Sequence, residues 1–478
     1  MKKLLIVLGS MTLIATVSAN VIACKTTDST ISETQLAQKV QTIWNDNFKN
    51  KITSAKNYSM IIEMVKDKLN NPKEKELISL SNQEELKNRP IKKQENQKIN
   101  IKIGERNISL DFGEVKEGKK LTKYRDPKTN EIKTTDAKDF SDKSNTELNE
   151  VKEIIEIGYY EHKDNHDADK LHIRAVVMPT SIQIVPKELP KEITSTRSMF
   201  WDAKEFNQDI SMWDTSNLET IDQMFVGAKK FNQDISKWDV SNVRIMDYAL
   251  SETEDFNQDL SNWNVGNVTS MKQMFSKSKF NNGQRPLTWN EKTKNVKTMY
   301  TMFAKNPVFN QDISKWDVSN VTDMTQMFLE AKEFNQDLSN WNVGNVKKMR
   351  FMFGSAEKFD NKGKSLNSWN VSKVEDMGNM FNKAKIFNQD ISNWKTSSLT
   401  NIEAMFLGAE KFDQDLSKWD AKKIKTYAGY QKGANKWTES SKWPKINGQQ
   451  KNNIILMSFI NSFFYALKLN LLNKTFNI

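Results

Sequence analysis

A set of nine apolar positions recurs along the chain between about residue 190 and residue 430. The pattern is clearest over 309–331, where the apolar residues are Phe309, Ile313, Trp316, Val318, Val321, Met324, Met327, Phe328 and Ala331. One tryptophan marks each copy, at intervals of 25 to 28 residues: Trp213, Trp238, Trp263, Trp289, Trp316, Trp341, Trp369, Trp394 and Trp419. Such a period is typical of repeat proteins, in which each unit packs on the next.

Each repeat predicts two short elements. Trp316 and Val318 share one face of a short strand, because alternate strand residues point the same way. Over 321–328 the apolar spacing i, i+3, i+6, i+7 predicts one or two helical turns. A unit this small cannot bury its own apolar face, so the copies must stack. We therefore expect a leucine-rich-repeat-like solenoid over 190–435, with a short parallel strand and a short helix in each of about nine 25-residue turns.

Two polar columns accompany the apolar skeleton. The first is an amide column, whose side chains we expect to bond from turn to turn: Asn232, Asn257, Asn310, Asn335 and Asn388. The second is a carboxylate column, expected to accept backbone N–H groups at turns: Asp234, Asp259, Asp312, Asp337, Asp390 and Asp415. A calcium-binding or catalytic array is the alternative for these aspartates, but the Gly-Gly-x-Gly-x-Asp spacing of calcium-binding repeats does not accompany them.

The repeat is interrupted in several places. Ala249-Leu250 replaces Met-Phe in one turn, and insertions lengthen 280–289 and 359–369 by two and three residues. We expect both insertions to bulge outward, since insertions in solenoids lie on the surface. After Trp419 the repeat decays, and 436–478 is expected to be a C-terminal cap or an apolar tail. For 451–478 an amphipathic cap, a membrane-touching helix and an out-of-frame tail all remain open.

The chain before the repeats predicts a small α+β region. Ser32-Glu-Thr-Gln forms a capping-box pattern, and apolar residues at helical spacing follow it as far as Phe48. A second helix is expected over 59–69, so 24–98 is interpreted as a tether followed by a helical and linker region. Apolar and polar residues alternate on both sides of 104–107, which predicts a β-hairpin over 99–112. The hairpin begins a small β-rich region over 99–189, with further strands near 154–160, 171–177 and 181–185.

One polar loop offers the residues from which a metal site could be argued: His162, Asp164, His166, Asp167 and Asp169. Metal ligands are normally fixed on a helix or a tight loop and oriented by further hydrogen bonds, so a solvated charged loop is the better interpretation. No catalytic triad, glycine-rich phosphate loop or cysteine pair occurs in the sequence. The sequence therefore predicts neither an enzyme nor a cofactor.

The first 24 residues have the pattern of an export signal. Lys2 and Lys3 precede an apolar run over 4–17 that is too short to span a bilayer about 30 Å thick. Then follow Ile22, Ala23 and Cys24, the only cysteine, and this order resembles the lipobox of bacterial lipoproteins. The resemblance implies a signal peptide over 1–23, cleavage between Ala23 and Cys24, and acyl chains such as palmitate at Cys24. It also implies an anchor on the extracellular face of the cell membrane; an ordinary signal peptide is the alternative.

The charge of the chain narrows the choice of partners. The formal net charge is +11 and the pI is about 9.2. A nucleic-acid-binding protein would gather its basic residues on one face beside stacking aromatics, whereas here lysine alternates with acidic residues, as over 87–100 and 116–143. We therefore expect no nucleic-acid partner. A solvated basic surface and attraction to anionic membranes or glycans remain as interpretations.

The repeat itself resembles a known family. The run Phe-Asn-Gln-Asp-Ile-Ser-Lys-Trp-Asp-Val-Ser-Asn-Val-Thr-Asp-Met, followed by Met-Phe, begins at Phe309 and is similar to the repeat of BspA-like surface proteins, the DUF285 family, which is abundant among mycoplasma lipoproteins. The likeness covers roughly 154–430. It implies a leucine-rich-repeat-like fold, surface exposure and, in some members, adhesion to host matrix proteins or bacteria. No enzymatic activity goes with the repeat, and only Cys24 carries over as a functional position.

The expected function is therefore binding, to a host extracellular-matrix protein or an acidic glycan. A structural or antigenically variable coat protein is the alternative, and a substrate-binding lipoprotein or enzyme is a third. The apolar columns are committed to the core, so recognition must use positions that vary between turns. The residues before the tryptophans line one flank of the strand face: Met212, Lys237, Asn262, Lys315, Asn340, Asn393 and Lys418. These residues serve solubility alone in the plainer interpretation, and the inserted loops at 281–288 and 360–368 are the other place for a site.

Overall fold

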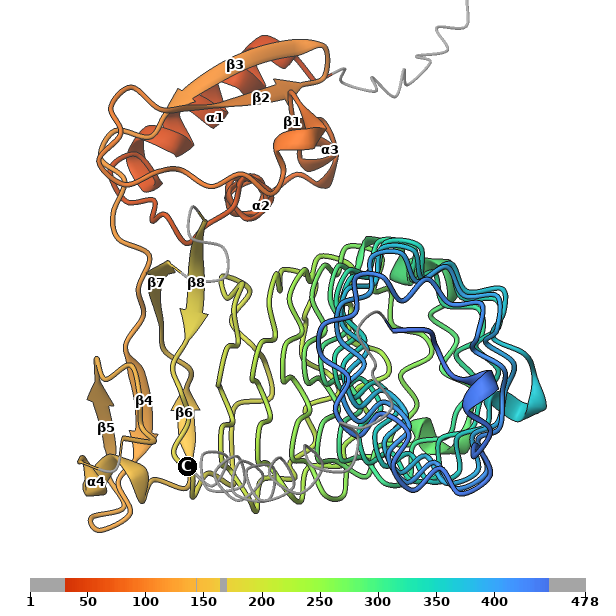
Figure 1. The fold of residues 1–478 in the computed structure, drawn as a ribbon. Helices are drawn as coiled ribbons and strands as arrows, with labels where there is room; N and C mark the ends of the chain where they lie inside the picture. Colours follow the sequence, from red (N-terminus) through yellow and green to blue (C-terminus); the bar gives the residue numbers. More distant parts are fainter. Residues whose placement is uncertain (1–30, 143, 164–169, 447–478) are drawn as a thin grey trace, which may run out of the picture. The chain divides into compact units, whose positions relative to one another are not determined.

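A computed structural model describes residues 31–142, 144–163 and 170–446 (Figure 1). The chain divides into two compact units. The first comprises Met1–Lys49, Tyr58–Lys87 and Asn96–Gly113, and the second comprises Asn50–Asn57, Asn88–Glu95 and Glu114–Ile478. Cys24 and Ala23, and the tail 451–478, lie outside the described residues. No helix within the described residues is long and apolar enough to cross a membrane.

The first unit packs helices against a small antiparallel sheet. Its elements are α1 (Glu33–Asn47), α2 (Tyr58–Asp67), α3 (Pro72–Glu76), β1 (Ile78–Leu80), the 3₁₀ turn η1 (Gln83–Glu85), β2 (Lys98–Ile103) and β3 (Arg106–Asp111). The strand order is β1-β2-β3. The Ser32 side chain accepts a hydrogen bond from the Gln35 amide, which confirms the predicted start of the first helix. The predicted hairpin is also confirmed, as β2 and β3 pair around Gly104, whose φ of 58° the turn requires.

The core of the first unit is centred on Trp44 of α1. Its ring meets Phe112 edge-on, with centroids 5.5 Å apart, and its Nε1 donates to the Asp111 carbonyl at 2.7 Å. Both aromatic side chains are buried. One tryptophan thus fixes α1 to the end of β3 through apolar packing and a hydrogen bond together.

The second unit begins with small sheets that lead into the repeats. Strands β4 (Thr122–Arg125), β5 (Ile132–Thr135) and β6 (Ile154–Glu156) form a sheet in the order β5-β4-β6, with the short helix α4 (Thr146–Asn149) between β5 and β6 in the chain. Strands β7 (Tyr159–Lys163) and β8 (Leu171–Ala175) form an antiparallel hairpin. A parallel bridge from Arg174 to Ser195 joins β8 to the first repeat.

The repeats stack as successive coils joined by parallel backbone hydrogen bonds. Parallel bridges occur once in each coil, at Ser195, Thr220, Ile245, Ser270, Thr298, Asp323, Lys348, Asp376, Asn401 and Thr426. Further along each coil, alternate N–H groups donate to the next coil; Phe225 bonds to the Ala249 carbonyl at 3.0 Å, and Gly227 to that of Ser251 at 3.1 Å. Figure 1 shows these coils lying one behind another from yellow through green to blue.

The local structure of a coil differs from the expected strand and helix. After the bridge at Asp323, the chain makes consecutive turns over 325–330, closed by bonds such as Met327 N–H to the Met324 carbonyl at 3.2 Å. Gln326 and Glu330 both have φ of 58°, in the left-handed region, which ends any helix. The parallel bridge lies at Asp323 and not within 313–318. The only helices described within 190–446 are 3₁₀ turns: η2 (Asn282–Gln284), η3 (Asn290–Asn295), η4 (Asn361–Gly363) and η5 (Ser440–Lys442).

The apolar skeleton forms the continuous core of the stack, as predicted. All nine skeleton positions of the 309–331 copy are at most 3 % exposed. Where a coil carries both phenylalanines they pair face to face, with centroids 3.9 Å apart between Phe328 and Phe334. Tryptophans also stack between coils, with centroids 6.1 Å apart between Trp369 and Trp394. The recurring aromatic residues therefore bury one another in columns.

Candidate binding face

The predicted row of variable residues is exposed along the stack. All seven side chains named from the sequence are exposed, and Met212 is 81 % exposed. Thr288 and Ser368 occupy the same place in the two coils that carry insertions, and they are exposed as well. The flank row is therefore continuous, and it consists of Met212, Lys237, Asn262, Thr288, Lys315, Asn340, Ser368, Asn393 and Lys418.

The tryptophan beside each member of the flank row holds that member in place. Trp316 Nε1 donates to the Leu287 carbonyl at 2.9 Å, and Trp341 Nε1 donates to that of Ile313 at 3.1 Å. The same bond reaches back one coil at Trp213, Trp238, Trp263, Trp289, Trp369, Trp394 and Trp419. Each indole is thus both a core side chain and a tie between coils, so the neighbouring exposed residue is set at the coil spacing.

The carboxylate column next to the flank row is used by the backbone, as predicted. The Ser236 and Ser417 amides donate to Asp234 and Asp415, each at 2.9 Å. Hydrogen bonds from the Ser236 and Ser417 hydroxyls and amides hold the pKa of these two carboxyls below the ordinary value. The aspartates are therefore charged turn-forming groups. Among the described residues, no group of three or more His, Cys, Asp and Glu side chains could hold a metal ion.

The amide column also behaves as predicted, with one detail that the sequence did not show. Asn310 Oδ1 accepts from the Asn335 amide and from Gln336 Nε2, each at 2.9 Å. In the coil with the second insertion, Asp360 takes the place of the asparagine and accepts from the Asn388 amide at 2.9 Å. The column therefore works as a ladder of acceptors for the next coil, and it precedes the flank row in each coil, as Asn310 precedes Lys315.

Both insertions form exposed basic loops. Residues 283–286 and 362–365 are exposed, as expected for outward bulges. Each loop is anchored by a fully buried asparagine that sequence reasoning missed, since Asn282 and Asn361 accept from the Leu260 and Leu338 amides. Arg285 forms an ion pair with Asp259 at 3.2 Å, which keeps that loop close to the preceding coil.

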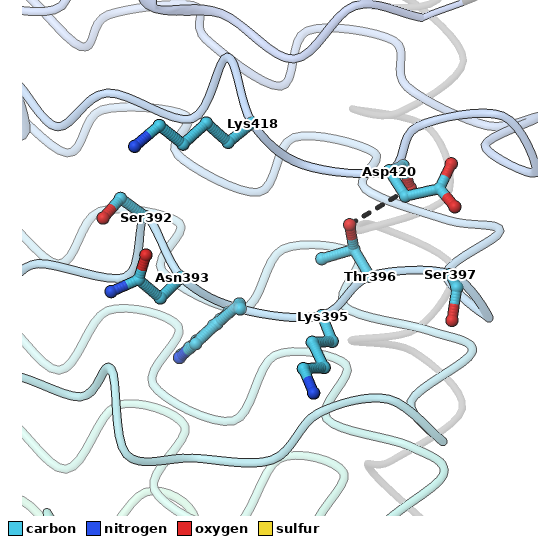
Figure 2. A pocket seen from close by; sticks show the side chains of 8 residues that line it. Ser392, Asn393, Lys395, Thr396, Ser397, Lys418 and Asp420 are labelled. Carbon is cyan, nitrogen blue, oxygen red and sulfur yellow. Dashed lines mark hydrogen bonds between the residues drawn. The ribbon is translucent and has the colours of Figure 1, made fainter.

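Two predicted flank residues meet in a shallow hollow at the end of the row (Figure 2). The hollow, of about 420 Å³, is lined by Ser392, Asn393, Trp394, Lys395, Thr396, Ser397, Lys418 and Asp420. Figure 2 shows Asn393 and Lys418 on adjacent coils, while the Thr396 hydroxyl donates to the Asp420 carbonyl at 3.1 Å. Lys395 stands where the other eight coils have Asp or Asn. This exception was visible in the sequence, and it adds a second ammonium group to the hollow.

The remaining candidates from the sequence are only partly described. Ala23 and Cys24 lie outside the described residues, as do Asp164, His166, Asp167 and Asp169 of the polar loop. His162 is in β7, where its ring lies 6.0 Å from that of Tyr160. The structure thus leaves the lipid-attachment prediction and most of the loop as sequence-based hypotheses.

Comparison with known proteins identifies the repeats. A family model described as a mycoplasma protein of unknown function, DUF285, matches 183–289, 280–368 and 362–459. Together these three segments cover more than half of the chain. No curated protein and no solved structure matches the chain.

Proposed function

Since the chain belongs to the DUF285 family of mycoplasma proteins, whose function is unknown, we propose that it is a surface-binding protein with a leucine-rich-repeat-like solenoid. In this proposal Cys24 is lipidated and anchors the chain on the extracellular face of the cell membrane, as the lipobox resemblance implies. The solenoid then presents the flank row to a partner. It acts by binding and performs no catalysis.

The observation that carries this proposal is the flank row itself. Three exposed ammonium groups, those of Lys237, Lys315 and Lys418, stand in one row beside buried tryptophans. The row is long and open, which favours an extended partner, because a small molecule needs a deeper cavity. An acidic glycan or an acidic matrix protein would meet several lysines at once, so binding would be multivalent and would weaken with salt.

Charge reversal tests the flank row. The variant Lys237→Glu, Lys315→Glu, Lys418→Glu should fold normally and lose at least tenfold in affinity for immobilised heparin at low salt. A control variant carries three reversals at exposed lysines elsewhere on the coils, Lys297→Glu, Lys347→Glu and Lys348→Glu. Equal losses of heparin affinity in both variants would mean that net charge, and not the flank row, governs binding. Unchanged binding in the first variant and across a salt titration would place the site elsewhere, with Arg285, Lys362 and Lys364 of the inserted loops as the next residues to reverse.

A coat protein without a specific ligand is the competing function. In that case the lysines and asparagines of the flank row only keep the stack soluble. Binding of the full-length protein to panels of matrix proteins and glycans separates the two functions, because a coat protein would show no saturable partner in either panel.

A further inference from the structure

Within the described residues, the last coil of the stack ends in a row of backbone N–H groups without acceptors. In the coil before it, four alternate amides donate to the last coil at 2.8–2.9 Å: Ile402 to Thr426, Ala404 to Ala428, Phe406 to Tyr430 and Gly408 to Lys432. The corresponding donors of the last coil have no acceptor among the residues that the structure describes: Tyr427, Gly429, Gln431 and Gly433. We call these four amides the terminal edge.

The terminal edge keeps the shape that receives a further coil. Gly429 and Gly433 have φ of 64° and 75°, in the same left-handed region as Ala404 and Gly408 one coil earlier, at 50° and 70°. Glycine holds this conformation without steric cost. The four donors therefore have the arrangement that binds a peptide backbone in every earlier coil.

The lysines of the last coil likewise lack acidic partners among the described residues. Earlier in the stack, lysines pair with acids one coil away, as in Lys229–Glu254 at 2.6 Å and Lys385–Glu357 at 2.7 Å. The last coil has five exposed lysines and no acidic residue between Ala421 and Thr438. None of these lysines forms an ion pair within the described chain: Lys422, Lys423, Lys425, Lys432 and Lys436.

We propose that the terminal edge binds an extended acidic peptide segment of a partner protein. The carbonyl groups of that segment accept hydrogen bonds from the four amides, as the next coil would, and its carboxylates pair with the lysines. Addition of an extended chain to an open edge is a recurrent mode of peptide recognition. The surface is distinct from the flank row, so the inference goes beyond the proposed function.

Charge complementarity favours a partner over the chain's own C-terminal segment. Residues 447–478 contain Lys451, Lys468 and Lys474 and no aspartate or glutamate. A segment with only positive charges would bring like charges together beside five lysines, which is unfavourable. A second copy of the chain carries a formal net charge of +11, so repulsion between like charges also disfavours it as the occupant of the terminal edge.

Amide hydrogen exchange tests the terminal edge directly. Full-length protein in mild detergent would be measured with and without poly-L-glutamate of about 20 residues. In the free protein the four amides should exchange quickly, because unbonded N–H groups are unprotected, and the peptide should slow them at least tenfold. Slow exchange in the free protein would overturn the proposal, because the edge would already be filled by the chain itself. An absence of added protection at saturating peptide would overturn it as well.

Variants and a second polymer separate the two kinds of contact. Lys425→Glu, Lys432→Glu, Lys436→Glu should weaken poly-L-glutamate binding at least tenfold, while the Lys297, Lys347 and Lys348 reversals should not. Polyacrylate carries carboxylates without backbone carbonyls, so it should bind more weakly and leave the four amides unprotected. Equal binding of both polymers would replace the peptide site with a general polyanion patch and so overturn the proposal. The flank lysines stay intact in this variant, so its result is independent of heparin binding.

Discussion

At the scale of single residues, each repeat tryptophan joins its coil to the preceding one. The Trp316 side chain is 3 % exposed, stacks on Trp289 with centroids 5.3 Å apart, and donates to the Leu287 carbonyl. Apolar burial and a hydrogen bond between coils therefore depend on one side chain. The residue just before it, Lys315, is exposed, so core and candidate binding face alternate along the backbone.

Two substitutions at Trp316 separate its two roles. Trp316→Ala should lower the free energy of unfolding by about 3–5 kcal/mol, because it removes a buried aromatic ring. Trp316→Phe keeps a ring but leaves the Leu287 carbonyl without its donor, and should cost about 1–3 kcal/mol. Urea unfolding measures both variants, with Met212→Ala at the 81 % exposed position as the control. A Trp316→Ala protein as stable as the control would mean that the column is not part of the core.

Residue-level prediction from the sequence succeeded where a residue type itself implies burial. The recurring apolar skeleton identified the core because few folds expose a phenylalanine and a tryptophan in every repeat. The bond from Trp316 to a backbone carbonyl could not be predicted, since carbonyl positions depend on coil geometry. Asn282 and Asn361 were missed because an asparagine in an inserted loop ordinarily indicates a solvated turn, whereas here each is fully buried.

At the scale of elements, the amide ladder predicts a matched pair of substitutions. Asn310→Ala removes the oxygen that accepts from the Asn335 amide and should cost about 1–3 kcal/mol, because that N–H loses its partner. Asn310→Asp keeps an acceptor and copies Asp360, which fills the same position in another coil, so it should cost less. Urea unfolding compares the two variants. Equal stability of both would show that water replaces the ladder bond at no cost.

The junction between β8 and the first coils predicts a dependence on pH. Glu219 lies 2.9 Å from Lys170 Nζ and 3.2 Å from the His172 ring nitrogen, and only 18 % of its side chain is exposed. Burial alone would raise the pKa of Glu219, but hydrogen bonds from His172 and Lys170 outweigh it and lower the pKa to about 2. In an unfolded chain the pKa is near the ordinary value of 4.5.

A lowered pKa in the folded state means that the charged form of Glu219 stabilises the fold. That contribution is fully present above pH 4.5 and is lost as the pH falls toward 2. Glu219→Gln should therefore reduce the loss of stability over this range, as measured by urea unfolding at several pH values. A parallel pH dependence in wild type and variant would assign the effect to other carboxyls. Arg244, whose guanidinium lies 4.0 Å from the Glu219 carboxylate, is present in both proteins, so it does not account for a difference between them.

The expected helix was absent for a geometric reason. Consecutive turns closed by i to i−3 hydrogen bonds bring every third or fourth side chain inward, so their apolar spacing is close to that of a helix. Residues with a left-handed φ distinguish these turns from a helix. The residue types of Gln326 and Glu330 do not indicate such a φ. The available signal was a few glycines: Gly227, Gly408 and Gly433 occupy the place of Glu330 in other coils, with φ of 71°, 70° and 75°, and Gly429 occupies the place of Gln326, with φ of 64°.

At the scale of the whole molecule, the proposed lipid anchor makes a prediction about membrane association. In the producing bacterium, a clickable palmitate analogue should label the wild-type protein and direct it to the membrane fraction. Cys24→Ser should be unlabelled and soluble, because two acyl chains are what give stable anchoring. Labelling of the Cys24→Ser protein would place the lipid elsewhere. Persistence of unlabelled Cys24→Ser protein in the membrane fraction would point to another attachment.

Because each coil bonds to its immediate neighbours, the number of repeats can change without disrupting the fold. The amide ladders, bridges and indole bonds of a coil reach only the adjacent coil on either side. The contacts at the two ends of the stack therefore do not depend on how many coils lie between them. Loss of 317–341 would join Trp316 to Asn342 and leave the same sequence of contacts in place. Duplication or deletion of such a 25-residue block would therefore yield foldable proteins of different length. Each copy gained would extend the reach of the stack by about 4.8 Å.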